Sequence, residues 1–188
     1  MIQLWHGGNR WEGHPEIRPS KQGRYECGPG IYLTTHYDTA RKYAKGGKVV
    51  TRVTLADDIR WIHRQKAPVQ SLRDYVSSTS RFPRRADILA DIDRAVERRS
   101  VNDAVTELAV ETLLNLAINR ECLAGQQGVL FARWLVEQGV DAMLHRAYGQ
   151  EQWVVVFNPD IIRRFEVVPA SAVNGDWDFP EIKLQDSA

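Results

Sequence analysis

Three short segments of the 188-residue chain combine reactive side chains with glycine-rich backbone or with an apolar strand. The first ends in His6-Gly7-Gly8, directly after the apolar residues Leu4 and Trp5. Two glycines, which lack side chains, let a ligand approach the backbone closely beside the imidazole. The segment therefore predicts either a ligand-binding histidine at a strand end or a histidine with a structural role.

The second segment places two tyrosines on neighbouring elements. Gly28-Pro29-Gly30 leads into a predicted strand that carries Tyr32, and Tyr43 follows 11 residues later on a predicted helix. Two phenol rings from adjoining elements can hold a flat ring from both sides. The alternative is that both rings belong to the hydrophobic core.

The third segment places a carboxylate at the start of an apolar strand. Glu151 stands between Gln150 and Gln152 and precedes a run of apolar residues. Because side chains alternate along a strand, Glu151 shares one face with Trp153 and Phe157. The pattern predicts either a carboxylate that faces a ligand or a solvated strand end.

Taken in this order, the three segments resemble the His-Tyr-Glu branch of the ADP-ribosyltransferase superfamily, which includes the poly(ADP-ribose) polymerases and their small bacterial relatives. Motif matches lie around His6, around Tyr32 and in the spacing from Tyr32 to Tyr43. The expected strand order extends the likeness over residues 1–56 and 140–168. The helical middle is similar to that of small phage-encoded anti-CRISPR transferases in size and placement only.

The resemblance implies NAD as co-substrate, with a role for each matched residue. His6 is expected to bind the adenosine ribose, and the Gly7 backbone to bind the nicotinamide carboxamide. Tyr32 and Tyr43 are expected to stack on nicotinamide, and Glu151 to bind the nicotinamide ribose. His6, Tyr32 and Glu151 are the expected catalytic residues. Gly8, Gly30 and Arg10 complete the expected cofactor-binding set, with Arg10 near the pyrophosphate.

Two positions depart from the family pattern. Ala40 stands where relatives often have a serine whose hydroxyl also holds the carboxamide. Glu151 lies slightly further from the end of its strand than the pattern places it, so a register slip of one residue would put Gln150 or Gln152 at the catalytic position instead.

The chemistry fits a carboxylate at this site. Loss of nicotinamide from NAD builds positive charge on the ribose, as in glycoside hydrolysis. A nearby carboxylate stabilises this charge more in the transition state than in the ground state. We therefore expect an NAD-dependent mono-ADP-ribosyltransferase that acts as a toxin or effector. Its macromolecular acceptor is expected to be a protein rather than a nucleic acid.

Other functions remain open. An RNA 2′-phosphotransferase or an antibiotic-modifying transferase could use the same fold, and Arg10 and Arg41 would then be critical. A non-catalytic binding module is the third possibility. It is favoured by Ala40 and by the open question of whether Glu151 or a flanking glutamine occupies the catalytic position. An arginine cluster in residues 81–99 is diluted by acidic residues and predicts a salt-bridged helix face rather than a nucleic-acid site.

Composition narrows the class of protein. The chain has 25 basic and 24 acidic residues, which argues against a surface devoted to polyanions, and 43% hydrophobic residues, enough for a core. Cys27 and Cys122 cannot form a disulfide scaffold and suit a reducing compartment. The histidines lack metal-ligand spacing. Without a signal peptide or an apolar run of membrane-spanning length, we expect a cytoplasmic protein with no metal and no membrane partner.

The pattern of apolar residues predicts a single α+β domain over residues 1–188. Predicted strands cover residues 2–5, 31–34, 48–55, 142–144, 153–157 and 165–168, and predicted helices cover 38–45, two stretches within 86–121, and 129–138. The second helix within residues 86–121 is expected to be capped near Ser100 or Asn102. We therefore expect the split, mixed or antiparallel sheets of an ADP-ribosyltransferase, with a helical insertion at about 66–139, no internal repeat and a loosely packed acidic tail.

Overall fold

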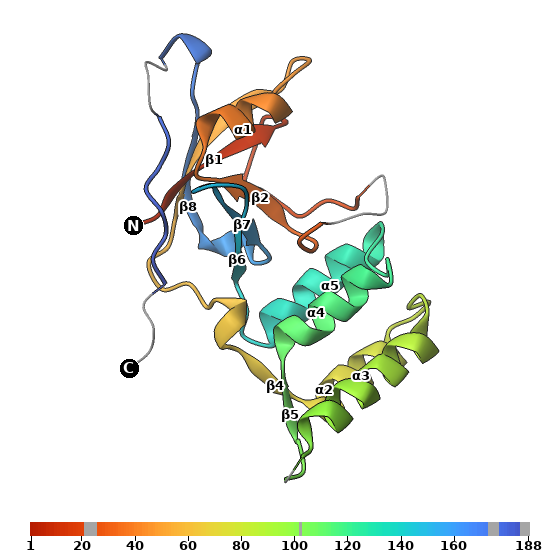
Figure 1. Ribbon diagram of the computed structural model, residues 1–188. Helices are drawn as coiled ribbons and strands as arrows, with labels where there is room; N and C mark the ends of the chain where they lie inside the picture. Colours follow the sequence, from red (N-terminus) through yellow and green to blue (C-terminus); the bar gives the residue numbers. More distant parts are fainter. Residues whose placement is uncertain (21–25, 102, 173–176, 185–188) are drawn as a thin grey trace. The chain divides into compact units, whose positions relative to one another are not determined.

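The computed structural model describes residues 1–20, 26–101, 103–172 and 177–184 (Figure 1). Its contacts divide the chain into two compact units. The first contains Met1–Glu16, Ile31–Ile59 and Ala142–Ala188, and the second contains Ile17–Gly30 and Arg60–Asp141. The two strand-rich ends thus build one unit, and the helical middle forms most of the other.

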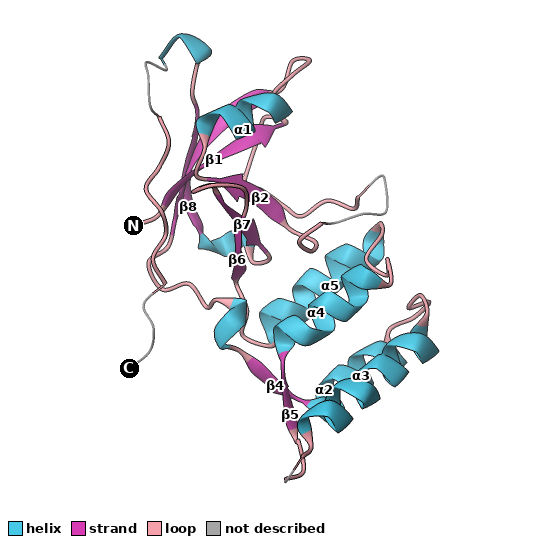
Figure 2. Cartoon of the chain, viewed as in Figure 1, coloured by secondary structure: helices cyan, strands magenta, loops and turns pink. Residues whose placement is uncertain are grey.

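A six-stranded sheet forms the first unit, and Figure 2 shows its strands in magenta. The strands, in chain order, are β1 (Gln3–Gly8), β2 (Ile31–Thr34), β3 (Val49–Leu55), β6 (Ala142–Arg146), β7 (Gln152–Val156) and β8 (Ile162–Val167). Their order across the sheet is β6-β7-β2-β1-β3-β8, and every neighbouring pair is antiparallel. The predicted α+β class is therefore confirmed at this level.

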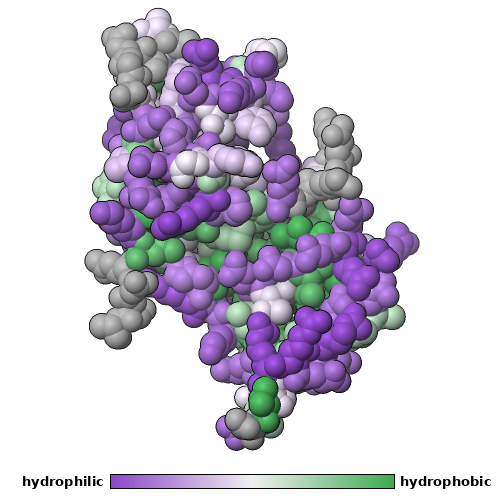
Figure 3. Space-filling view, in the orientation of Figure 1, coloured by the Kyte–Doolittle hydropathy of each residue, from purple (hydrophilic) through white to green (hydrophobic). Residues whose placement is uncertain are grey.

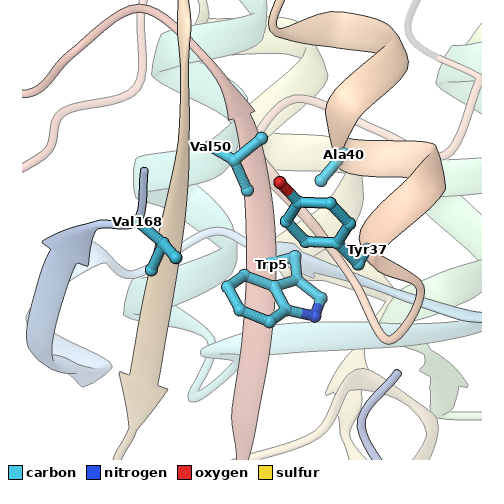
Figure 4. Close-up of a cluster of buried hydrophobic side chains, with 5 residues drawn as sticks. All are labelled: Trp5, Tyr37, Ala40, Val50 and Val168. Atoms are coloured by element: carbon cyan, nitrogen blue, oxygen red, sulfur yellow. The ribbon is translucent and has the colours of Figure 1, made fainter. Parts of the chain in front are cut away.

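Helix α1 (Tyr37–Tyr43) packs against the sheet through a small apolar cluster, drawn in Figure 4. Trp5 of β1 lies at its centre, with the Tyr37 ring edge-on to it at a centroid distance of 5.2 Å. The other members are Ala40, Val50 and Val168. Burial of these side chains fixes the face of the sheet that α1 covers.

The second unit pairs two short strands, each of which runs directly into a helix. β4 (Lys66–Pro68) is followed by α2 (Val69–Ser78) and α3 (Arg85–Arg99), and β5 (Glu107–Ala109) is followed by α4 (Val110–Asn119) and α5 (Gln126–Glu137). The strands are antiparallel partners. The helix expected after Ser100 is wrong in its first half, because residues 107–109 form β5, and the alternative cap Asn102 lies outside the described residues.

These two β-α-α stretches form an internal repeat with a period of 41 residues. The Val69 N–H donates to the Thr106 carbonyl, and the equivalent Val110 N–H donates to the Gln65 carbonyl, at 2.9 and 3.1 Å. Buried positions recur with the same offset: Ala67, Val69, Leu72 and Val76 correspond to Leu108, Val110, Leu113 and Ala117. The expectation of no internal repeat is therefore wrong at the level of the backbone.

Two arginines of the cluster in residues 81–99, Arg84 and Arg94, pair with carboxylates, and Arg85 donates to backbone carbonyls. Asp91 accepts hydrogen bonds from both Arg94 and Arg120, and these arginines hold its pKa below the usual range despite partial burial. Arg84 pairs with Asp87 within the same helical region. In Figure 3 the surface over α2 and α3 is mostly hydrophilic, in keeping with a solvated, salt-bridged face.

Candidate functional site

The end of β1 follows the point at which β1 and β2 stop pairing. The ladder between them consists of the single pair Trp5–Thr34, whereas β1 pairs with β3 from Gln3 to Gly8. Successive strand residues point their backbone groups to opposite edges, and the Ile2 carbonyl accepts from β3. By this alternation Gly7 presents its N–H and carbonyl to the edge that β2 no longer occupies.

His6 has a defined orientation and protonation state. Its Nδ1 lies 2.9 Å from the Tyr32 carbonyl, so this nitrogen carries the proton, and its ring stacks on Trp11 at a centroid distance of 4.7 Å. Burial lowers the pKa of His6, and the hydrogen bond to Tyr32 opposes this only in part. The neutral ring keeps Nε2 as an acceptor.

Gly8 leaves space at this acceptor. A Cβ atom on Gly8 would lie 2.7 Å from His6 Nε2. The absence of a side chain at Gly8 therefore keeps the acceptor nitrogen clear on that side.

Gly7 is required by the close approach of α1 to β1. A Cβ atom at Gly7 would lie 1.8 Å from the carbonyl oxygen of Ala40. The Ala40 side chain is buried in the apolar cluster around Trp5. An alanine suits this position, because a buried hydroxyl would need a hydrogen-bond partner there.

Glu151 is half-buried directly before β7, and two donors fix its carboxylate. Thr34 Oγ1 and Trp153 Nε1 both donate to Glu151 Oε1, each at 2.7 Å. Burial acts to raise the pKa of Glu151, but hydrogen bonds from Thr34, Trp153 and Thr39, with the nearby His36, outweigh it and lower the pKa below its usual value. The carboxylate is therefore ionised at neutral pH.

Register places the key side chains on one face. In the ladder between β2 and β7, Thr34 lies opposite Trp153 and Tyr32 lies opposite Val155, and directly opposed residues project to the same side. Because Glu151 and Trp153 are two residues apart, Glu151 shares this face. The predicted face for Glu151 and Trp153 is confirmed by their hydrogen bond.

The two neighbouring glutamines have other environments. Gln152 is only 1% exposed, and its side-chain amide accepts from the Ile182 N–H at 2.6 Å and donates to the Ile182 carbonyl at 3.1 Å. Gln150 is exposed in the turn between β6 and β7. Of these three residues, Glu151 is the one whose side chain lies with Thr34 and Trp153.

The remaining predicted residues are Tyr43, Arg10, Arg41 and Gly30. Tyr43 ends α1 and is 61% exposed, and Arg10 and Arg41 are also exposed. Gly30 belongs to the second unit and directly precedes β2 in the chain. The first unit thus joins His6 to Tyr32 by a hydrogen bond, whereas Tyr43 and Arg10 lie on its surface.

Sequence reasoning did not single out several residues that shape this site. Thr34 and His36 flank the carboxylate of Glu151, and Trp11 covers His6. Thr34 could have been found, because alternation from Tyr32 places it on the same face. Trp11 carried no signal, because it lies in a loop without periodicity.

The chain matches no protein-family model, and neither the curated proteins nor the solved structures give a match. Among the residues that the structure describes, no group of three or more histidine, cysteine or acidic side chains could hold a metal ion. Within the same described ranges, no helix has both the length and the apolar character needed to span a membrane.

Proposed function

We propose that the protein is an NAD-dependent mono-ADP-ribosyltransferase that transfers ADP-ribose to a macromolecular acceptor and releases nicotinamide. The observation that carries this proposal is the Glu151 carboxylate, ionised and held by Thr34 and Trp153 on the sheet face that also bears Tyr32. The antiparallel sheet with α1 on one face supports an ADP-ribosyltransferase-like fold.

In the proposed reaction, the bond between nicotinamide and ribose breaks and its electron pair leaves with nicotinamide. Positive charge develops on the anomeric carbon, and an acceptor nucleophile then bonds to that carbon and loses a proton. Glu151 stabilises the charge because its carboxylate is already ionised and oriented before the reaction begins. The lowered pKa of Glu151 supports this role.

Groups at the end of β1 and on β2 are suited to the nicotinamide end of NAD. Tyr32 shares the face of Glu151, whereas His6, which follows Trp5 opposite Thr34, projects from the other face. The Gly7 N–H and carbonyl can pair with a carboxamide, and the Tyr32 ring can stack on the pyridinium. His6 Nε2 can accept a hydrogen bond from a ribose hydroxyl. Tyr43, on α1, is the proposed second ring, and Arg10 the proposed contact to phosphate.

We propose a protein rather than a nucleic acid as acceptor, and a cytoplasmic location. The net charge of +1 and the paired arginines around Asp91 support a protein acceptor. Neither Cys27 nor Cys122 forms a disulfide, which suits a reducing compartment.

Transfer of label from adenylate-labelled NAD in a bacterial lysate tests the proposal. The wild type should label macromolecules, and Glu151→Gln should slow labelling by about 100-fold. Glu107→Gln, the same change at an exposed glutamate of β5, should leave the labelling rate unchanged. Loss of the labelled band on protease treatment but not on nuclease treatment identifies a protein acceptor. Equal labelling by wild type and Glu151→Gln would contradict the role of Glu151. A wild type that neither labels macromolecules nor binds NAD would favour a non-catalytic module.

A further inference from the structure

The C-terminal residues Trp177–Leu184, here called the C-terminal strap, are fixed to the centre of the first unit. The Trp5 Nε1–H donates to the Trp177 carbonyl at 2.7 Å. The rings of Trp177 and Phe179 stack on Trp5 at centroid distances of 6.0 and 4.9 Å. The expectation of a loosely packed tail is therefore wrong for this part, because the strap's aromatic side chains join the apolar cluster that α1 also contacts.

Asp178 in the strap caps helix α1. The Tyr37 N–H donates to Asp178 Oδ1 at 2.9 Å, and His36, the residue that precedes the helix, makes no side-chain capping bond of its own. The other carboxylate oxygen lies 3.4 Å from His36 Nε2. In addition, the Phe179 N–H donates to the Thr35 carbonyl at 2.8 Å. The strap thus fixes the turn between β2 and α1.

A second attachment lies beside Glu151. The side chain of Gln152 makes its two hydrogen bonds to the backbone of Ile182 in the strap. Gln152 also bonds to Thr35 through backbone groups and the threonine hydroxyl, so the start of β7 and the end of β2 are held together. An exposed ion pair between Arg146 and Glu181 adds a peripheral contact.

These contacts surround the Thr34–Glu151 pair without involving it. The strap bonds to Thr35, to His36 and to Gln152, which are the next residues along the chain from Thr34 and Glu151. Helix α1, whose start is capped by Asp178, carries Thr39, a further hydrogen-bond partner of Glu151.

We propose that the C-terminal strap is a positioning element for the catalytic carboxylate, and that Asp178 is its principal positioning residue. The inference rests on the proposed function. Asp178 acts through α1 and His36 rather than by contact with NAD. Its capping bond sets where α1 begins and hence where Thr39 meets Glu151, and the Gln152–Ile182 bonds set the start of β7.

The test measures nicotinamide release from NAD by the full-length protein as a function of pH. Asp178→Ala should lower kcat by at least tenfold, leave KM for NAD within twofold, and move the acidic limb of the kcat profile to higher pH, because Glu151 loses ordered donors. Asp178→Asn keeps the acceptor for the Tyr37 N–H and should restore kcat to within threefold of the wild type. Glu181→Ala, at the exposed ion pair, should change neither quantity.

The outcomes separate the two proposals. An Asp178→Ala variant with wild-type kcat and an unshifted acidic limb overturns the positioning role while the proposed function stands. A wild type that releases no nicotinamide overturns both. If Asp178→Ala has a lower thermal denaturation temperature but its folded fraction keeps an unshifted acidic limb of kcat, the role of Asp178 is purely structural and the positioning role is overturned. If Asp178→Ala does not fold, Gln152→Met, which removes both bonds to Ile182, should shift the limb in the same direction, and an unshifted limb overturns the inference.

Discussion

Replacement of Gly7 by alanine tests whether α1 rests directly on the end of β1. The Cβ atom that the substitution adds would lie 1.8 Å from the Ala40 carbonyl oxygen, and real Cβ atoms essentially never come within 3.0 Å of such an atom. The two elements must therefore separate by about 1.2 Å, the difference between these distances, and the neighbour is backbone that cannot rotate away.

The expected cost follows from two opposing effects. Overpacking of this kind typically destabilises by about 1–3 kcal/mol. Replacing glycine by alanine returns about 0.5–1 kcal/mol, because alanine loses less conformational freedom on folding. Overlap of 1.2 Å with rigid backbone places the cost at the upper end, about 3 kcal/mol, and a return of about 1 kcal/mol leaves a loss of about 2 kcal/mol in the free energy of unfolding.

Urea unfolding monitored by tryptophan fluorescence measures this loss, with Gly8→Ala as the matched control. At Gly8 the new Cβ meets the His6 side chain rather than backbone. Turning the imidazole aside loses its bond to the Tyr32 carbonyl, about 1 kcal/mol, and alanine returns about 0.5–1 kcal/mol. We therefore expect stability within about 0.5 kcal/mol of the wild type and a higher KM for NAD. Equal stability of the two variants would refute the close approach of α1 at Gly7.

Four further outcomes follow from the structure. Thr34→Val removes a donor to Glu151 and should move the acidic limb of kcat to higher pH in steady-state assays. The pKa of Glu151 is lowered in the folded state, so its ionised form stabilises the fold above the ordinary pKa of about 4.3. The stability difference between wild type and Glu151→Gln, measured by urea unfolding, should therefore shrink as pH falls through the lowered pKa. The pKa of His6 is also lowered, so KM for NAD should stay constant above about pH 6.5 and rise only below it, as protonation removes the Nε2 acceptor. Asp141 is 3% exposed and accepts three hydrogen bonds from Arg60. Asp141→Asn should lower the free energy of unfolding of the protein, measured with urea, by about 2 kcal/mol. Unchanged stability would contradict the role of this charge.

The sheet was largely predictable because its strands carry strong local signals. The strand over 31–34 agrees with β2, and the alternation of residues 48–55 agrees with β3. The face of Glu151 followed from the two-residue period, because burial of one side of a strand fixes the orientation of every second residue.

The second unit was less predictable. Helix α2 has buried Leu72 and Val76, but the serines that follow and a mixed composition resemble a loop. The 41-residue repeat was hidden because only two of its four buried pairs, Val69/Val110 and Leu72/Leu113, keep the same residue type. Backbone bonds between Gln65–Val69 and Thr106–Val110, which carry no sequence signature, define it.

The candidate site shows the same division between local and tertiary information. His6, Tyr32 and Glu151 could be selected from their neighbours in the sequence. Of the donors that hold Glu151, Trp153 lies two residues away, but Thr34 comes from β2 and Thr39 from α1. The cap of α1 comes from Asp178, 141 positions away along the chain. Two aromatic residues around Asp178, followed by the apolar Ile182 and Leu184, were the local sign of the strap.

The most direct test of the proposed chemistry is the rate of nicotinamide release from NAD labelled in its nicotinamide ring. We expect release by the wild type and a fall in kcat of about 100-fold in Glu151→Gln, equivalent to about 2.7 kcal/mol of transition-state stabilisation. The Kd for NAD should stay within a few fold, because the amide keeps the shape of the carboxylate. Release at the wild-type rate by Glu151→Gln, or none by the wild type, would contradict the account.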